Sequence, residues 1–146
     1  MISLLQRVSQ ARVTVAGAVV GEIGTGLLVL VCAEPQDGLL QANKLVDKLL
    51  KLRLFADQAG KMNRSVVDVQ GGLLIVSQFT LAADLSRGKR PGFTGAADPQ
   101  LGRMLYAAVL RLARERHPVV AAGIFGADMQ VSLVNDGPVT IPLRIP

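Results

Sequence analysis

Apolar and polar positions along this chain predict short strands in its first and last thirds and helices between them. Near the start, runs rich in Val, Ile and Leu are separated by polar or glycine-containing turns, which is typical of strands with tight connections. In the last third, apolar and polar residues alternate over residues 129–134, are interrupted over 135–138, and resume over 139–145. The other strands expected are residues 2–8, 11–15, 19–23, 27–33, 66–69 and 73–76.

Two longer stretches repeat their apolar residues every three or four positions, which predicts amphipathic helices. The first begins after Asp37, its expected N-cap. The second has Asp98 as N-cap and Pro99 at the first helical position, and it ends before Pro118. The residues expected to face the core are Leu39, Ala42, Leu45, Val46, Leu49, Leu50 and Leu52 in the first helix, and Leu101, Met104, Leu105, Ala108 and Leu112 in the second.

Residues 1–146 suffice for one domain with a real core and are too few for two. The pattern of elements predicts the α+β class, in which mostly antiparallel strands curl around or against two amphipathic helices. Hydrophobic residues make up 50% of the chain, charged residues only 18%, and the mean hydropathy is +0.40. Because this is more apolar surface than a small monomer readily hides, the composition favours a homo-oligomer.

Features that direct proteins to membranes or to oxidising compartments are not expected here. The apolar runs are too short to span a bilayer, and the first residues lack the basic region and cleavage site of a signal peptide. The lone cysteine, Cys32, lies within an apolar run and has no second cysteine to pair with, so it is interpreted as a small buried hydrophobe. We therefore expect a cytoplasmic protein with no membrane contact.

The charge of the chain favours a polyanionic partner. The formal net charge is +5 and the sequence pI is about 10.0, whereas aromatic residues make up only 3% and tryptophan is absent. If the partner is a nucleic acid, contact with its backbone is expected rather than base stacking. Residues 84–95 form a basic irregular loop that carries Arg87, Lys89 and Arg90, and the sequence leaves a solvated loop and a phosphate-contacting arm equally open.

Two short motifs stand out by their chemistry. The buried strand at residues 73–76 runs directly into Ser77, Gln78 and Thr80, whose burial without partners would cost about 1 to 3 kcal/mol each. They either cap neighbouring backbone or face a site. Later, Gly137 and Pro138 interrupt a stretch that otherwise reads as sheet, which a tight hairpin turn at a bend or edge explains by itself.

The two motifs together carry a family resemblance. Ser-Gln-Phe-Thr at 77–80 and Gly-Pro-Val-Thr at 137–140, in this order and in a chain of this length, resemble the signature motifs of D-aminoacyl-tRNA deacylases of the D-tyrosyl-tRNA deacylase type. The chain departs from that family's usual pattern at Gly92, where serine is common, and at Cys32, where glycine is common. Weaker blocks match in the same order at residues 6–8, 21–24, 60–63, 87–91, 126–129 and 133–136.

The resemblance implies a homodimer with a β-barrel-like core that hydrolyses the ester between a D-amino acid and the 3′ end of tRNA. Glycine mischarged on tRNA is an implied second substrate. The Gly137–Pro138 bond is then cis, and its loop enters the partner subunit's pocket, where main-chain carbonyls hold the substrate's α-amino group and an L side chain collides with the loop. The active sites accordingly lie at the subunit interface.

The same resemblance assigns roles to individual residues. Ser77, Gln78 and the main-chain amide of Phe79 would face the scissile ester, and Arg7 would brace Gln78. No cofactor or metal is implied. The catalytic residues are Ser77, Gln78, Phe79 and Thr80; the substrate-binding residues are Gly137, Pro138, Val139, Thr140, Arg7, Phe125 and Met129; Arg87, Lys89 and Arg90 are expected at the acceptor stem of the tRNA.

The residue inventory agrees with an unusual catalytic strategy. The chain has one histidine, His117, and one cysteine, neither placed within the motifs, and no cluster with metal-ligand spacing. Nothing in the motif activates Thr80 as a nucleophile. We therefore favour main-chain stabilisation of the oxyanion with assistance from the terminal ribose 2′-hydroxyl. Three alternatives remain: Thr80 as nucleophile, a threonine-dependent hydrolase of small esters or amides, and a non-catalytic RNA-binding module.

Overall fold

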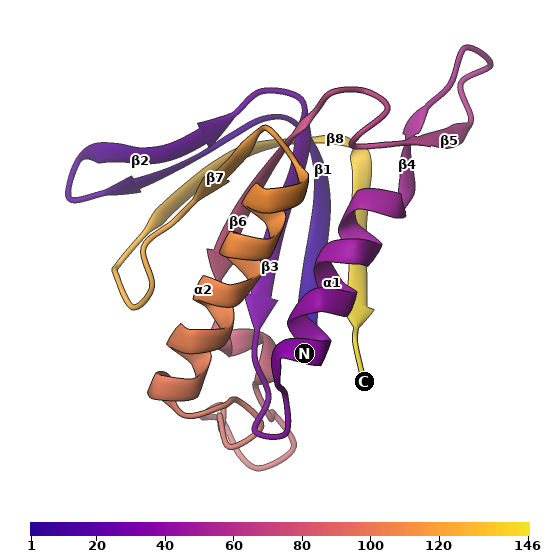
Figure 1. Cartoon of the computed structure of the whole chain (residues 1–146). Coiled ribbons are helices and arrows are strands. Elements are labelled where there is room, and N and C mark those ends of the chain that lie inside the picture. Colours follow the sequence, from indigo (N-terminus) through magenta and orange to yellow (C-terminus); the bar gives the residue numbers. More distant parts are fainter.

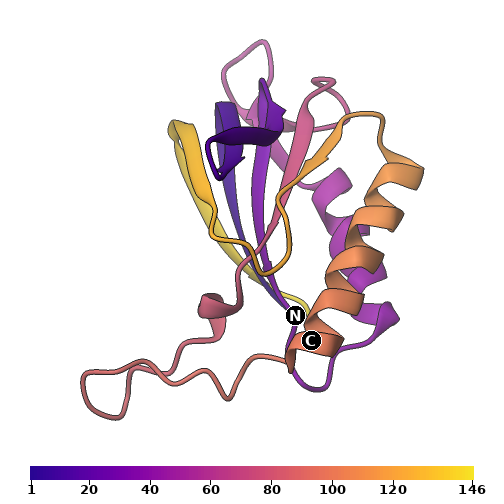
Figure 2. The same ribbon diagram turned by 90° about the vertical axis from the view of Figure 1, so that its left-hand side faces the viewer.

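A six-stranded mixed sheet curls into a nearly closed barrel, and two helices lie side by side against one of its faces (Figures 1 and 2). The structure is a computed structural model that describes all residues from Met1 to Pro146. Its helices are α1 (Leu39–Lys51) and α2 (Pro99–Arg116), with a short 3-10 helix, η1, at Phe79–Ala82. Its strands are β1 (Ile2–Val15), β2 (Ala18–Ile23), β3 (Gly26–Cys32), β4 (Arg53–Ala56), β5 (Met62–Ser65), β6 (Gly72–Ser77), β7 (Val120–Ala122) and β8 (Gln130–Arg144).

The long strands β1 and β8 form the spine of the sheet. β1 pairs antiparallel with β3 over its first half, with β2 over its second half, and with β8 along both halves. The sequence pattern predicts two short strands where the structure has β1, and two more where it has β8. That prediction is wrong, because β1 and β8 continue to pair with each other across register irregularities between Gln6 and Gln10, and this pairing keeps both backbones extended.

On the other side of β3 the pairing becomes parallel. β3 pairs with β6, and β6 pairs with β7. Because parallel neighbours need a crossover connection, α1 and α2 fill these two connections and cover the sheet. The α+β plan with mostly antiparallel pairing and two helices is confirmed. At Gly21 the backbone of β2 lies against Ala122 of β7, since a Cβ there would lie 2.4 Å from the Ala122 carbonyl oxygen.

Alternate residues of β3 and β6 enter two separate cores. Leu27 and Val29 of β3 and Leu73 and Ile75 of β6 pack against the helices, whereas Leu28, Leu74 and Val76 pack inside the barrel. Burial on both faces is the environment that continuous apolar runs indicate.

The helix boundaries are mostly as predicted. Asp98 is the N-cap of α2, and its carboxylate accepts hydrogen bonds from the main-chain nitrogens of Gln100 and Leu101 at 3.0 and 3.1 Å. The N-cap of α1, however, is Gly38 and not Asp37. Asp37 instead accepts a hydrogen bond from the amino group of Met1 at 2.8 Å.

Three residues or segments differ from the predicted pattern in other ways. Leu39, the first residue of α1, and Met104 of α2 are 56% and 52% exposed, so neither belongs to the core. Residues 66–69 form a turn, whereas the polar segment β5 pairs with β4 in a separate hairpin that projects from the body (Figure 1).

Neither α1 nor α2 combines the length and the apolar character that a membrane-spanning helix requires.

The Gly26→Ala substitution should disrupt the β3–β6 pairing. A Cβ at Gly26 would lie 2.0 Å from the carbonyl oxygen and 2.7 Å from the nitrogen of Gly72, so the two backbones must move apart. We expect the free energy of unfolding to fall by about 1 to 3 kcal/mol or more, measured by chemical denaturation. Gly24→Ala is the matched control, because its Cβ meets nothing within 4 Å. Equal stability of the two variants would contradict this explanation.

Candidate active site

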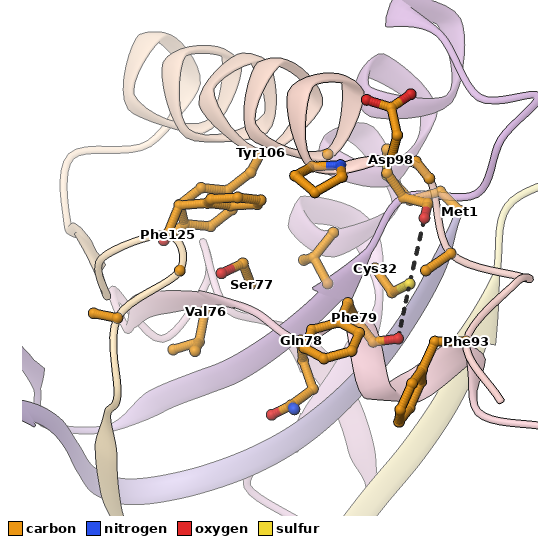
Figure 3. Close-up of a pocket in the computed structure, with 18 of the residues that line it drawn as sticks. Met1, Cys32, Val76, Ser77, Gln78, Phe79, Phe93, Asp98, Tyr106 and Phe125 are labelled. Atoms are coloured by element: carbon orange, nitrogen blue, oxygen red, sulfur yellow. Dashed lines mark hydrogen bonds between the residues drawn. The ribbon is translucent and has the colours of Figure 1, made fainter. Parts of the chain in front are cut away.

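A pocket of about 680 Å³ opens at the end of the sheet where β3 and β6 terminate (Figure 3). Its walls come from the ends of these two strands, the first turns of α2, the segment 125–131 and the base of the loop that follows η1. Most of the lining is apolar, and the polar groups are few. Such a site is typical of small-molecule binding with a small number of orienting contacts.

Three of the four residues of the Ser-Gln-Phe-Thr motif line this pocket. β6 ends at Ser77, and the Gln78 nitrogen still donates to the carbonyl of Val31 at 2.8 Å before the chain turns into η1. Ser77 and Gln78 are half-buried, and the ring of Phe79 packs edge-to-face on Phe93 with centroids 4.9 Å apart.

The fourth residue, Thr80, lies outside the pocket lining and is exposed. Its hydroxyl accepts a hydrogen bond from the side-chain amide of Gln78. No carboxylate, imidazole or amine bonds to this hydroxyl. The geometry therefore offers Thr80 no general base.

Cys32 forms part of the pocket floor beside Phe79 (Figure 3). Its thiol donates to the carbonyl oxygens of Ala33 at 3.4 Å and of Phe79 at 3.5 Å. Burial, and to a smaller extent the carboxylate of Glu34, raises the pKa of the Cys32 thiol, so it stays protonated. The sequence correctly indicated a buried cysteine, but nothing in it placed the side chain in the pocket.

Aromatic residues of α2 and of the segment that follows β7 form the opposite wall. The Tyr106 hydroxyl donates to the carbonyl of Ile75 at 2.8 Å, and burial raises the pKa of Tyr106 to about 12. The Phe125 ring lies 6.0 Å from the Tyr106 ring and 4.7 Å below the guanidinium of Arg103. Phe125 and Met129, the residues expected near the pocket, both line it, whereas no sequence pattern pointed to Tyr106.

The amino group of Met1 is buried at the edge of the same pocket. It donates to Glu34 and Asp37, both at 2.8 Å, and to the carbonyl of Ile145 at 2.9 Å. Although burial tends to raise the pKa of Glu34, hydrogen bonds from the Met1 ammonium and from Arg144 outweigh it and hold this pKa below its usual value. The first and last strands are thereby fastened together beside the pocket.

The Gly-Pro-Val-Thr motif lies elsewhere in the same chain. Thr140 of β8 pairs with Gln6 of β1, and Gln6 pairs in turn with Leu28 of β3. Ser77 of β6 pairs with Val31, which lies three residues further along β3. At about 3.3 Å per residue this separates the two pairs by roughly 10 Å, and the Gly137–Pro138 tip lies beyond Thr140. The Gly137–Pro138 peptide is cis, both residues are exposed, and neither lines the pocket.

Contacts with β1 and within β8 hold this second motif. Asn135 accepts from the Val139 nitrogen at 3.2 Å and donates to the Thr140 hydroxyl at 2.8 Å. Arg7 donates to the carbonyls of Leu54 at 2.8 Å and Asp136 at 3.1 Å. Within the chain Arg7 therefore braces the Gly-Pro loop and makes no hydrogen bond to Gln78, contrary to the expectation from the sequence.

The remaining expected site residues are on the exposed loop after η1. Arg87, Lys89 and Arg90 are all exposed, and the strand-like pairing of Asp84 with Gly92 closes the base of the loop. No three His, Cys, Asp or Glu side chains lie close enough together to hold a metal ion.

Comparison with solved structures shows first which known proteins share this fold. The fold matches a structure described as a probable eukaryotic D-amino acid tRNA deacylase with a TM-score of 0.89, at 17% identity, over 99% of this chain and 98% of that one. It also matches the c-Myc DNA unwinding element binding protein with a TM-score of 0.94, at 40% identity, over 100% of this chain and 99% of that one. The chain therefore shares its fold with both of these proteins.

Sequence comparison then identifies the family. The family model described as D-Tyr-tRNA(Tyr) deacylase matches residues 4–144. The D-aminoacyl-tRNA deacylase of Methylibium petroleiphilum is 71% identical over 99% of this chain and 95% of its own length. The corresponding protein of an Azoarcus species is 65% identical over 100% of this chain and 97% of its own. The chain belongs to the D-Tyr-tRNA(Tyr) deacylase family of enzymes, which hydrolyse ester bonds of aminoacyl-tRNA.

The Tyr106→Phe substitution tests the role of the buried hydroxyl in the pocket wall. Removing the donor to Ile75 should lower the free energy of unfolding at neutral pH by about 1 to 3 kcal/mol. Folding raises the pKa of Tyr106 from 10.0 to about 12. The stability gained by keeping the phenol protonated is therefore complete below about pH 10 and is lost as the pH rises toward 12.

Denaturant unfolding from neutral to alkaline pH would measure this effect, and the variant should lose less stability than the parent chain above about pH 10. Tyr106 is the only tyrosine, so the ultraviolet absorbance of phenolate reports its titration directly. A titration midpoint near the ordinary value in the folded protein would refute the assignment.

Proposed function

We propose that the chain hydrolyses the ester that joins a D-amino acid, or mischarged glycine, to the 3′ end of tRNA, releasing free amino acid and tRNA. The observation that carries this proposal is the pocket in which Ser77, Gln78 and the Phe79 main chain meet apolar walls without a nucleophile–base pair. Membership of the deacylase family supports the ester and the tRNA. The physiological role would be chiral proofreading in translation quality control, in the cytoplasm.

The main-chain amide of Phe79 is the proposed oxyanion donor. Phe79 is the first residue of η1, and the first N–H groups of a helix have no carbonyl acceptor within it. A fixed N–H of this kind can stabilise the charge that develops on the ester carbonyl oxygen, and one such donor is worth about 3 to 4 kcal/mol in other enzymes. Ser77 and Gln78 would orient the ester beside it.

In this mechanism the substrate supplies the group that activates water. The ribose 2′-hydroxyl next to the ester is within reach of an attacking water, whereas the Thr80 hydroxyl is exposed, lies outside the pocket lining and has only the Gln78 amide as a partner. An unassisted hydroxyl is a weak nucleophile at neutral pH. Thr80 is accordingly assigned to positioning Gln78.

The choice between D and L substrates would require a second copy of the chain. The exposed Gly137–Pro138 loop is too far from its own pocket to touch a substrate there. In the proposed dimer it would enter the pocket of the partner subunit. Its carbonyls would hold the α-amino group, and its bulk would exclude an L side chain. The brace from Arg7 to Asp136 would keep the loop in shape for this task. The active unit is thus a homodimer with its sites at the interface.

The tRNA would also contact the exposed basic loop. Arg87, Lys89 and Arg90 carry three positive charges at the tip of this loop, beyond the pairing of Asp84 with Gly92. The base of the loop lines the pocket through Phe93, Ala96 and Ala97. Charges in this place can meet the acceptor-stem phosphates of a tRNA whose 3′ end lies in the pocket.

A second candidate function is nucleic-acid binding without hydrolysis. It is favoured by the net charge of +5 and by the likeness to the c-Myc DNA unwinding element binding protein.

Deacylation of D-Tyr-tRNA, L-Tyr-tRNA and Gly-tRNA, compared in the presence of a chelator, tests the proposed function. We expect release of the D-amino acid and glycine and protection of the L-form, because only an L side chain collides with the loop. Equal hydrolysis of the D and L esters would contradict the proposal that the loop excludes L-amino acids. Absence of hydrolysis with retained tRNA binding would favour the non-catalytic alternative.

Thr80→Ala separates the two mechanisms of ester hydrolysis. If Thr80 only positions Gln78, the rate of a single turnover should fall by about tenfold or less. If its hydroxyl is the nucleophile, the loss should be roughly 10⁴-fold or more. Thr94→Ala is a suitable control, because Thr94 is an exposed loop residue outside the pocket lining.

A further inference from the structure

A groove on the outer side of α1 collects five positively charged side chains and does not belong to the pocket. Its volume is about 590 Å³, and it lies between α1, the start of β4 and the end of β8. We call it the basic groove. It is lined by Lys44, Asp47, Lys48, Lys51, Leu52, Arg53, Arg144, Ile145 and Pro146.

Acidic side chains neutralise only part of this charge. Asp47 is the single acidic side chain in the lining, and it pairs with Lys51 at 2.7 Å. Arg144 pairs with Glu34 at 2.5 Å. The other three cations, Lys44, Lys48 and Arg53, are exposed and have no salt bridge, so they are free to meet an anion. The pair between Asp47 and Lys51 is itself exposed, and such pairs are worth little.

The electrostatics of α1 explain part of the cluster but not all of it. Lys48 and Lys51 lie in the last turn, where positive charge favourably meets the helix dipole. Lys44 lies a turn earlier, whereas Arg53 belongs to β4 and Arg144 to β8. Cations from three elements therefore converge on one groove, which capping of a single helix does not require.

The dimensions and position of the groove suit a nucleic-acid strand. From Lys44 to Lys51 the helix rises by about 10 Å at 1.5 Å per residue, roughly the length of three nucleotides in one strand of a duplex. The groove also begins next to the pocket, because Arg144 and the Met1 ammonium both bind Glu34 and Met1 lines the pocket.

We propose that the basic groove binds the sugar-phosphate backbone of the RNA whose 3′ end occupies the pocket. This inference rests on the proposed function, and it adds a second RNA-binding surface to the basic loop. The loop extends on the sheet side of the molecule and α1 lies on the helix side, so the two surfaces approach the RNA from different directions (Figure 2). The groove holds the RNA by charge alone, without reading its bases.

The test compares two double variants that remove the same charge from different helices. Lys44→Gln with Lys48→Gln alters the groove, and Arg111→Gln with Arg114→Gln alters exposed positions of α2 outside both the groove and the pocket. For each variant, binding of an acceptor-stem RNA hairpin that carries no amino acid is measured at several salt concentrations. Each is also assayed for kcat/KM on D-Tyr-tRNA and on the D-tyrosyl ester of adenosine, which has no stem.

We expect the groove variant to bind the hairpin about tenfold more weakly. The slope of its binding constant against salt concentration, on logarithmic axes, should flatten by about 0.9 for each phosphate that is no longer neutralised. Its kcat/KM should fall on D-Tyr-tRNA and stay unchanged on the adenosine ester. The control variant should behave like the parent chain in every assay. This combination supports the groove as an RNA-binding surface.

Equal losses in both variants would mean that net charge alone matters, and no loss in the groove variant would mean that the RNA does not touch it. Either result overturns the inference. If the parent chain hydrolyses neither ester, the proposed function fails, but hairpin binding by the two variants still decides the fate of the groove.

Discussion

The parallel pairing of β3 with β6 is the constraint on which the position of the site depends. Both strands are buried on both faces, and at one end Gly26 and Gly72 allow their backbones to come into close contact. From there the register runs without a shift to Val31 and Ser77. Because the whole pairing is buried, it cannot slip without exposing core residues. The polar segment after β6 must therefore emerge beside Cys32, under the first turn of α2, where the pocket lies.

Local patterns predicted the elements whose causes are local. The apolar runs of β3 and β6 and the Asp98-Pro99 start of α2 are examples, because burial and capping leave a signal within a few residues. The continuity of β1 and β8 depends on their pairing with each other across more than a hundred residues. Likewise, Asp37 binds the amino group of a residue 36 positions away, and no local pattern could have shown this.

The site shows the same division between local and distant causes. The motif at 77–80 could be recognised from sequence and marks the pocket, whereas Tyr106 and Cys32 reach it only because α2 and β3 pack beside β6. The two signature motifs also lie apart in the structure, because they pair at different levels of the sheet. The proposed homodimer would meet two requirements at once, because it would bring the exposed loop to a pocket and would cover apolar surface.

The pocket contains few protein groups that could move a proton near neutral pH. Its thiol is held protonated by burial, its phenol has a pKa of about 12, and the carboxylate of Asp98 is engaged in capping α2. His117 lies at the other end of β6, bonded to Gly71. In the proposed mechanism, proton transfer is therefore assigned to the ribose hydroxyl of the substrate and to the attacking water. The same apolar lining strengthens any hydrogen bond made inside the pocket. Burial therefore keeps the thiol and the phenol protonated, and it also increases the stabilisation that a single main-chain donor can give to an oxyanion.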